Sequence, residues 1–497
     1  MDPVEYRGDY IRGRFVPVRE GTGDGLITSI SARDTADTVM RAPFRLAHVE
    51  EAVQAAREAQ REWASRPLTE RMKFLKKVKA QFHNRQEDLA HLIARELGKP
   101  LWEARAEVSA CIHKVEITLH EGLQLVRTVH PEGVPGYYAF KPHGVLAVIG
   151  PFNFPVHLAN GHIVPALVTG NTVVLKPSEI TPAVGQLYAE IMDEADLPRG
   201  VFNLVQGDGT VGAALAGHPG LHGVLFTGSY AVGRKIQDLC REQPWKILAL
   251  EMGGKNPAIV LEDAPMEKAV RDVAWGAYVT AGQRCSGTSW AIVHRRRVDE
   301  FVEKLAVRAR RLVVGDPLEP GTFMGPLATQ AARQKFLDGV AAGEREGAEV
   351  VVPARQLDPE PPGWYVTPGV HRVHQVREGS YYQTEELFGP DVAVYSARDL
   401  DEAVALANSV DYGLSCSVFT QEEKHFEWAW RRLEYGCINH NAPTCGASSK
   451  LPFGGLKKSG NHRPSALFAT LYCTHPVATL VGGTSVDPKT ESPGFDG

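Results

Sequence analysis

The chain has 497 residues, of which 43% are hydrophobic and 23% are charged, and its formal net charge is -5 at pH 7. This composition is typical of globular proteins, and the length predicts two or three domains. The charge balance, without any long block of Lys and Arg, argues against nucleic acid as a partner. The seven scattered cysteines form no C-x-x-C pair, which favours a reducing compartment over a disulfide framework.

Neither export nor membrane insertion is predicted. The first residues, MDPVEYRGDYIRGRFV, are of mixed charge and lack the apolar core of a signal peptide. The most apolar run, residues 163–175, is interrupted by Pro165, Gly170 and Asn171, so it falls short of the roughly 18 apolar residues that span a membrane. We therefore expect a cytoplasmic protein without membrane contact.

Two amphipathic helices are predicted within the first hundred residues. Apolar side chains recur at helical spacing over residues 47–63. Residues 69–97 predict a second helix, with Thr69 as a possible cap and with Gly98 and Pro100 as stop signals. Both helices are expected to serve as scaffold.

From residue 144 onward, short runs of Val, Leu and Ile alternate with helical patterns. This alternation predicts βαβ units on parallel sheets, whose ligands bind beyond the carboxyl ends of the strands. The predicted strands lie at 144–150, 171–179, 200–207 and 222–229, and in a second series at 257–263, 289–295, 349–354 and 391–397. Helices are predicted at 181–195 and 298–314, and the proline-rich residues 353–368 predict a surface loop.

One cysteine lies in a sequence context that suits catalysis. Residues 279–290 are VTAGQRCSGTSW, which places Cys285 in a predicted bend between apolar runs. A thiol at this position serves either as a nucleophile or as a small buried hydrophobic group. The second role is the more common one for a lone cysteine, so other motifs must decide.

Two motifs at predicted strand ends are candidates for nucleotide binding. FTGSYAVGRKI, residues 226–236, offers backbone N–H groups and a helix N-terminus to a phosphate, but it lacks the full G-x-G-x-x-G spacing. KPSE offers Lys176 and Glu179 either to ribose hydroxyls or as a solvated charge pair.

Two further polar residues have apolar neighbours. Glu251 in LALEMGGKNP is either a general base or a helix-capping charge. Asn153 in GPFNFP either donates a hydrogen bond to a developing oxyanion or satisfies the backbone of a turn. Each residue is ambiguous by itself.

Taken together, these motifs resemble the aldehyde dehydrogenase superfamily. The matching stretches follow the family's order and cover about residues 10 to 480: GPFNFP, GNTVVLKPSE, FTGS, LEMGGKNP, GQRC, EELFGP, YGLSCSVFT and PFGGLKKSG. Several stretches, above all SGNHRPSA, are similar to the subfamily of succinylglutamate semialdehyde dehydrogenases, which act in bacterial arginine catabolism. The chain departs from that subfamily at Lys255 and in SGTSW after the cysteine.

The resemblance implies oxidation of an aldehyde to a carboxylic acid with NAD as the cofactor. Cys285 would form a thiohemiacetal and then a thioester, Asn153 would stabilise the oxyanion, and Glu251 would activate water. Lys176 and Glu179 would hold the adenosine ribose, where a carboxylate favours NAD over NADP. The other implied contacts are Gly228 and Ser229 at the pyrophosphate, Glu386 at the nicotinamide ribose and Phe388 beside the ring.

The implied substrate is N-succinylglutamate 5-semialdehyde, and the implied anchor of its tail is the loop at 441–455. Gly161 stands where many relatives have a bulky aromatic residue, which predicts a wider entrance. Each candidate substrate contact serves equally well as an ordinary supporting hydrogen-bond partner. These candidates are Gly446, Ala447, Ser448, Ser449, His157, Asn160 and Arg284.

The resemblance also implies a Rossmann-like cofactor domain, an α/β catalytic domain and a small β extension for oligomerisation. We assign residues 1–123 and 144–250 to the NAD-binding domain, 251–460 to the catalytic domain, and 124–143 with 461–497 to the extension. Residues 123–143 are expected to form a hairpin, 470–481 a strand that needs a partner, and 482–497 a loose tail. Exposed strand edges favour pairing between subunits, so we expect a homodimer or homotetramer.

Several alternatives remain. A related aldehyde dehydrogenase acting on another semialdehyde or on a simple aldehyde would differ only in the substrate loop. A CoA-acylating relative would lack Glu251, and a catalytically silent structural protein would have lost Cys285. Cys437, His440 and Cys445 have a spacing that could suit a metal, but three ligands without a fourth predict no metal site.

Overall fold

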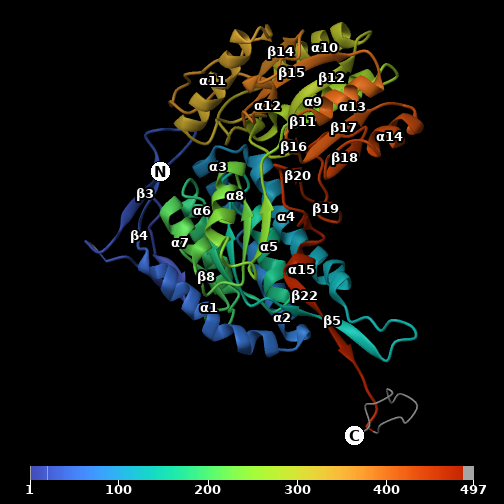
Figure 1. Ribbon diagram of the computed structural model, residues 1–497. Coiled ribbons are helices and arrows are strands. Elements are labelled where there is room, and N and C mark those ends of the chain that lie inside the picture. The colour runs from blue at the N-terminus through green and yellow to red at the C-terminus, as the bar shows by residue number, and fades with distance from the viewer. Residues whose placement is uncertain (1, 20, 485–497) are drawn as a thin grey trace.

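The computed structural model describes residues 2–19 and 21–484, and it contains two large sheets in two lobes (Figure 1). The first sheet has the order β10 (Ile247–Glu251), β9 (Gly223–Thr227), β6 (Val145–Ile149), β7 (Thr172–Lys176), β8 (Phe202–Leu204), β1 (Asp9–Ile11) and β2 (Arg14–Val16). Strands β10 to β8 are parallel, and β1 is antiparallel to β8. Every residue of β6, β7 and β9 is buried, as expected for a parallel sheet with both faces covered.

Helices surround this first sheet. They are α1 (Ala47–Ser65), α2 (Leu68–Asn84), α3 (Gln86–Leu97), α4 (Leu101–His120), α5 (His157–Val168), α6 (Pro182–Glu194), α7 (Gly209–Gly217) and α8 (Tyr230–Cys240), with the 3-10 helix η1 (Gly122–Val126) after α4. Helix α4 packs against α2, α3 and α5, so it lies inside the helical layer. A short sheet of β3 (Gly25–Ile30) and β4 (Thr38–Phe44) lies at the edge of this lobe (Figure 1).

The second sheet forms the other lobe. Its order is β13 (Glu349–Val352), β14 (Gly369–Val373), β15 (Asp391–Ala397), β12 (Thr288–His294), β11 (Asn256–Val260), β17 (Ser415–Phe419) and β18 (Cys437–His440). Its helices are α9 (Met266–Tyr278), η2 (Val279–Gly282), α10 (Val298–Arg311), α11 (Gln330–Arg345), α12 (Tyr381–Thr384), α13 (Leu400–Asn408) and α14 (Glu423–Trp430). All neighbours from β14 to β18 are parallel, and β13 is antiparallel to β14.

The carboxyl-terminal part of the chain returns from the second lobe to the first. It forms β16 (Tyr412–Gly413) with β20 (Leu456–Lys457), β19 (Pro452–Phe453) with β21 (Ser465–Ala466), and α15 (Ala469–Tyr472). The last strand, β22 (Thr474–Leu480), pairs with β5 (Gly136–Pro142), and this ribbon projects from the body (Figure 1).

The structure corrects the predicted helix over 69–97. Two helices, α2 and α3, are separated at Arg85, whose φ of -100° and ψ of 17° are not helical. Apolar periodicity continues across this single residue, so the pattern could not reveal the turn. The cap is also corrected, because α2 begins after Pro67 and Thr69 lies inside its first turn. The stop is confirmed: Gly98 ends α3 with a left-handed φ of 79°.

The predicted hairpin over 123–143 is likewise wrong. Strand β5 pairs along its whole length with β22, from Gly136 opposite Leu480 to Pro142 opposite Thr474. Within the segment itself only an isolated bridge joins Val129 to Tyr138. The strand predicted over 470–481 begins later, at Thr474, because 469–472 is helical.

No helix among residues 2–19 and 21–484 is long and apolar enough to cross a membrane. Most of the predicted tail, residues 485–497, lies outside the described residues. The predicted domain boundaries remain a prediction.

Candidate active site

The candidate site lies where the two lobes meet, at the carboxyl ends of the parallel strands. Glu251 is the last residue of β10, and Asn153 follows β6 in the first sheet. From the second lobe, the segment after α9 brings Cys285 to the same place, since Asn153 Nδ2 donates to Gln283 O at 2.8 Å. Three predicted residues from distant parts of the chain therefore come together.

The segment before Cys285 has an unusual backbone. Thr280, Ala281 and Gly282 all have left-handed φ angles, of 58°, 51° and 71°. Each of the two non-glycine residues costs roughly 1–2 kcal/mol in this conformation. For Gly282 a side chain is excluded as well, because a Cβ would lie 2.3 Å from the backbone of Gly389.

A buried carboxylate on α4 stabilises this turn. Glu103 is 2% exposed; its Oε2 accepts the Thr280 N–H at 3.1 Å, and its Oε1 accepts the Thr280 hydroxyl. The same Oε1 accepts from Arg284 Nη2 at 2.8 Å, and Arg284 Nε donates to Thr280 Oγ1. The first lobe thus fixes the residue immediately before Cys285.

The surroundings of the half-buried Cys285 thiol strongly oppose its ionisation. Burial raises its pKa to about 12, with further contributions from the negative charges of Glu386 and Glu251. The Ser286 N–H and the Arg284 charge act in the opposite direction without prevailing. The carbonyl of Cys285 is held by Asn256 Nδ2 at 2.7 Å, so the backbone at the nucleophile is anchored on β11.

Glu251 has the environment of a poised base. It is 5% exposed, and burial raises its pKa well above the ordinary range, with only the Gly455 N–H acting to lower it. Its Oε2 has no hydrogen-bond partner among the described residues. A buried carboxyl group with a free oxygen beside a thiol is suited to exchange a proton with water or substrate.

A buried ion pair positions the segment that carries Asn153. Lys99 Nζ donates to Asn153 O at 2.7 Å and to Glu107 Oε2 at 2.6 Å. The other Glu107 oxygen accepts the N–H groups of Val156 and His157 at the start of α5, both at 3.1 Å. Both charged side chains are fully buried, so the amide of Asn153 is presented from a fixed backbone.

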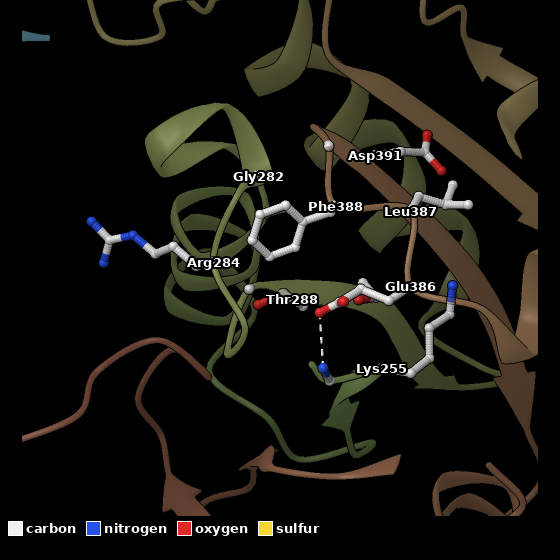
Figure 2. Close-up of a pocket in the computed structure, with 13 residues that line it drawn as sticks. Lys255, Gly282, Arg284, Thr288, Glu386, Leu387, Phe388 and Asp391 are labelled. Atoms are coloured by element: carbon white, nitrogen blue, oxygen red, sulfur yellow. Dashed lines mark hydrogen bonds between the residues drawn. The ribbon is translucent and has the colours of Figure 1, made fainter. Parts of the chain in front are cut away.

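Beside the thiol is a pocket lined by the segment 386–389 (Figure 2). Glu386 Oε1 accepts the Gly254 N–H at 2.8 Å, and burial raises the pKa of Glu386 to about 7. Phe388 has a left-handed φ of 57°, and its ring lies 5.9 Å from that of Phe152. The Arg284 side chain points away from Glu386 and Phe388 in this view (Figure 2).

The predicted nucleotide contacts lie at the ends of adjacent strands. Lys176 ends β7, and its Nζ is 2.9 Å from Glu179 Oε2. Ser229 caps α8 after β9, with its Oγ accepting the Val232 N–H, and the Gly228 N–H donates to Glu251 O at 3.0 Å. Because β7 and β9 both flank β6, these groups meet at one sheet edge that could hold a dinucleotide.

The predicted substrate contacts are spread more widely. Arg284 is engaged with Glu103, as described above, and its guanidinium lies 4.9 Å from the centre of the Phe154 ring. Asn160 is fully buried, and its amide bonds to Cys111 O and the Tyr188 hydroxyl. In the loop at 441–455, three candidates are exposed: Gly446, Ala447 and Ser448.

Sequence reasoning missed the charged face of α4. Lys99, Glu103 and Glu107 recur at intervals of four; Glu103 and Glu107 lie on one side of α4, and Lys99 lies two residues before the helix begins at Leu101. This spacing in GKPLWEARAE was the available signal, but a solvated face has the same pattern. Burial of all three residues is what distinguishes them.

Comparisons with known proteins identify the family of this chain. The model of the aldehyde dehydrogenase family matches residues 27–475. Two curated relatives, from Cronobacter sakazakii and Salmonella agona, are named N-succinylglutamate 5-semialdehyde dehydrogenase. Each is 40% identical to this chain; the matches cover 98% and 90% of the chain and 96% and 91% of the relatives.

Solved structures share the whole fold. An NAD-dependent aldehyde dehydrogenase from Sinorhizobium meliloti is 31% identical with a TM-score of 0.92, covering 97% of this chain and 96% of its own. An aldehyde dehydrogenase from Pseudomonas syringae, solved with NAD+ and octanal, is 31% identical with a TM-score of 0.89, covering 95% and 96%. The predicted fold class is thus confirmed, and the chain belongs to the aldehyde dehydrogenase family, whose members oxidise aldehydes with a nicotinamide cofactor.

Proposed function

We propose that this enzyme oxidises N-succinylglutamate 5-semialdehyde to N-succinylglutamate with NAD, through a covalent adduct on Cys285. The observation that carries the chemistry is the meeting of the Cys285 thiol, the Asn153 amide and a Glu251 carboxyl group with one free oxygen. Support for the substrate comes from the curated relatives, whose names specify this semialdehyde.

The first step is attack of the Cys285 sulfur on the aldehyde carbon, with the thiol proton passing to the Glu251 carboxylate and from there to solvent. The electron pair of the C=O bond moves to oxygen, where an N–H of Asn153 and the N–H of Cys285 stabilise the charge. One such donor typically lowers the barrier by ~3–4 kcal/mol. Asn153 donates one of its two side-chain N–H groups to Gln283 O, which orients the amide, and the second N–H remains for the oxyanion.

The second half of the reaction depends on Glu251. Hydride acceptance is the chemistry that a bound nicotinamide supplies, and it leaves a thioester on Cys285. Glu251 then takes a proton from water, the water oxygen bonds to the acyl carbon, and the C–S bond breaks to release the acid. The raised pKa of Glu251 makes its carboxylate a stronger base than an exposed glutamate.

The residues at the sheet edge fit a nicotinamide dinucleotide. Lys176 and Glu179 would hold the adenosine ribose, Gly228 and Ser229 the pyrophosphate, and Glu386 with Phe388 the nicotinamide end. The Glu386 carboxylate lies close against the backbone of Gly253, where a Cβ would lie 2.3 Å from Glu386 Oε2. This close contact fits a binding site in which Glu386 holds the nicotinamide end.

Preference for NAD over NADP rests on Glu179. Although burial raises its pKa, the charge and hydrogen bond of Lys176 lower it overall, so the group is a carboxylate at neutral pH. A carboxylate accepts hydrogen bonds from ribose hydroxyls and repels a 2′-phosphate. We also propose a homo-oligomer, a cytoplasmic location, and tail contacts from Gly446, Ala447 and Ser448.

A cofactor-reduction assay tests this function. We expect the enzyme to prefer N-succinylglutamate 5-semialdehyde to simple aliphatic aldehydes, and Cys285→Ser and Glu251→Gln to lose turnover. Cys240→Ser, which changes a buried thiol at the end of α8, is the matched control and should keep full activity. Equal rates with simple aldehydes would refute the substrate, and normal turnover in either site variant would remove that residue's role.

A further inference from the structure

Lys114 is a buried cation for which the proposed chemistry has no use. It lies on α4 with 1% exposure, and its ammonium donates to Ala466 O at 2.5 Å. An ammonium has three N–H donors, and among the described residues the structure provides one acceptor for them, the carbonyl of Ala466. The neighbouring carboxylates on α4 pair elsewhere, Glu107 with Lys99 and Glu103 with Arg284.

A second polar group without a partner lies near Lys114. His157 is the first residue of α5, and its Nδ1 is buried with no hydrogen-bond partner among the described residues. Burial lowers the pKa of His157 to about 4; the charge of Glu107 opposes this shift, and the positive charges of Lys114, Lys99 and Arg284 add to it. The imidazole is therefore neutral. Its buried Nδ1, as donor or as acceptor, has no hydrogen-bond partner among the described residues.

Open space lies on the helix that carries His157. Gly161 lies one turn after His157 on α5, so the two residues share a helix face. A Cβ on Gly161 would meet no atom within 4 Å. Helix α5 packs against both α4, which carries Lys114, and β21, the strand that contains Ala466.

Ring and cation contacts link His157 to the segment that carries Cys285. The rings of His157 and Phe154 are 6.4 Å apart, and the Arg284 guanidinium lies 4.9 Å from the Phe154 ring centre. Arg284 immediately precedes Cys285. A substrate with its aldehyde at the thiol would therefore extend toward His157 and Lys114.

We propose that Lys114 and His157 form a carboxylate-binding subsite for the end of the substrate remote from the aldehyde, an inference that rests on the proposed function. Since Lys99 and Arg284 already have carboxylate partners, Lys114 leaves one uncompensated positive charge in the cluster. A substrate carboxylate would neutralise this charge and satisfy the free nitrogen of His157. The space at Gly161 admits the chain that carries it.

Comparison with other buried lysines shows why burial alone does not carry this proposal. Lys246 donates to Ala216 O and His218 O, and Lys255 donates to Tyr382 O and Glu385 O. Each has two carbonyl acceptors, whereas Lys114 has one, a neighbouring free imidazole nitrogen and adjoining space.

Steady-state kinetics of Lys114→Met with three aldehydes test the subsite. N-succinylglutamate 5-semialdehyde has two carboxylates, N-acetylglutamate 5-semialdehyde lacks the succinyl one, and pentanal has none. We expect KM to rise about 10- to 100-fold for N-succinylglutamate 5-semialdehyde, whose succinyl carboxylate is the remote one, with KM for the other two aldehydes unchanged. Lys114→Arg should recover part of the lost affinity. The matched control Lys246→Met should leave KM unchanged for all three aldehydes.

A second variant leaves the charge in place. Gly161→Leu fills the open space without weakening the helix, since Leu is a better helix former than Gly. We expect it to raise KM for N-succinylglutamate 5-semialdehyde more than for pentanal. Equal losses on both aldehydes in the Lys114 and Gly161 variants, or no loss in either, would overturn the subsite.

Calorimetry with the product separates this inference from the proposed function. Burial lowers the pKa of Lys114 to about 8, so binding of this tricarboxylate near pH 8 should raise it and draw a proton from the buffer. N-succinylglutamate should bind the wild-type enzyme with proton uptake and bind Lys114→Met weakly and without it. A wild-type enzyme indifferent between the semialdehydes and pentanal refutes the substrate; unaltered product binding in Lys114→Met refutes the subsite.

Discussion

The Cys285 sulfur lies in an environment that opposes its ionisation. Burial raises its pKa to about 12, and the carboxylates of Glu386 and Glu251 add to the effect. The local motif predicted Cys285 as the nucleophile, but it could not reveal this pKa. The charged groups that raise it are Glu251 at the end of β10 and Glu386 in the segment before β15, each more than thirty residues away in the sequence.

The rate of thiol alkylation reports directly on these charges. In Glu386→Gln a negative charge near the sulfur is removed, which favours the thiolate, lowers the Cys285 pKa and speeds reaction with iodoacetamide at pH 8. A fall of one pKa unit would give about a tenfold increase. Glu385→Gln is the neighbouring control, and Cys285→Ser identifies the modified thiol; an unchanged or slower rate in Glu386→Gln would contradict the account.

The pH dependence of turnover reports on Glu251. A general base must be deprotonated, so activity is lost as the pH falls through its pKa. Because burial raises that pKa well above the ordinary value of 4.5 for a glutamate, the acidic limb of kcat should lie well above pH 4.5. The limb should vanish from the residual activity of Glu251→Gln. A wild-type limb near pH 4.5 would show that the group is solvated and not poised.

At the scale of single elements, a contact between α4 and the turn before Cys285 holds this residue in place. The left-handed residues Thr280 and Ala281 persist because α4 supplies a buried carboxylate for the turn. The motif around Cys285 predicted a bend, but the partner could not be predicted, since Glu103 and Thr280 are 177 positions apart in the sequence.

Glu103→Gln tests this arrangement. The change leaves Arg284 without its carboxylate and removes an acceptor from Thr280, so we expect a loss of roughly 3–5 kcal/mol in the free energy of unfolding. The turnover number should fall more than KM rises, because the backbone at Cys285 loses its support. Urea denaturation and steady-state kinetics measure both. Glu116→Gln, on the exposed side of the same helix, should be nearly silent; similar effects in the two variants would contradict the role of Glu103.

Local patterns predicted the central strands of both large sheets but not where all strands pair. Runs of Val, Leu and Ile predicted eight of their fourteen strands, because both faces of a parallel sheet are buried, whereas β1, β2, β10, β14, β17 and β18 were not predicted. The break at Arg85 and the pairing of β5 with β22 were missed. A single non-helical residue leaves periodicity intact, and a strand contains no record of a partner more than 330 positions away.

At the scale of the whole molecule, the β5–β22 ribbon stands apart from both lobes (Figure 1). An isolated pair of strands is only marginally stable in water, so the ribbon needs a further surface to cover it. Large apolar side chains are exposed there, with Leu480 at 79% and Val481 at 58%. These features favour assembly of several copies of the chain.

Light scattering tests the assembly. We expect a mass of two or four times the 54.3 kDa of one chain. Leu480→Asp places a charge on the exposed end of the ribbon and should shift the enzyme toward smaller species. A wild-type monomer at micromolar concentration would contradict the oligomer.

The site as a whole was predictable where chemistry follows local motifs. Cys285, Glu251, Asn153 and the sheet-edge residues were predicted from such motifs, and the structure places Asn153 and Glu251 near the segment of Cys285. Lys114 and the charged face of α4 were not, because their importance lies in being buried against segments from elsewhere in the chain.

The most direct test of the account is mass spectrometry of the intact protein after quenched turnover. With Glu251→Gln, loss of the base should slow hydrolysis of the thioester, so an acyl adduct should accumulate and map to the peptide containing Cys285. The wild-type enzyme should show the same adduct at lower occupancy, and Cys285→Ser should show none. Turnover without any adduct on Cys285 would contradict the proposed chemistry.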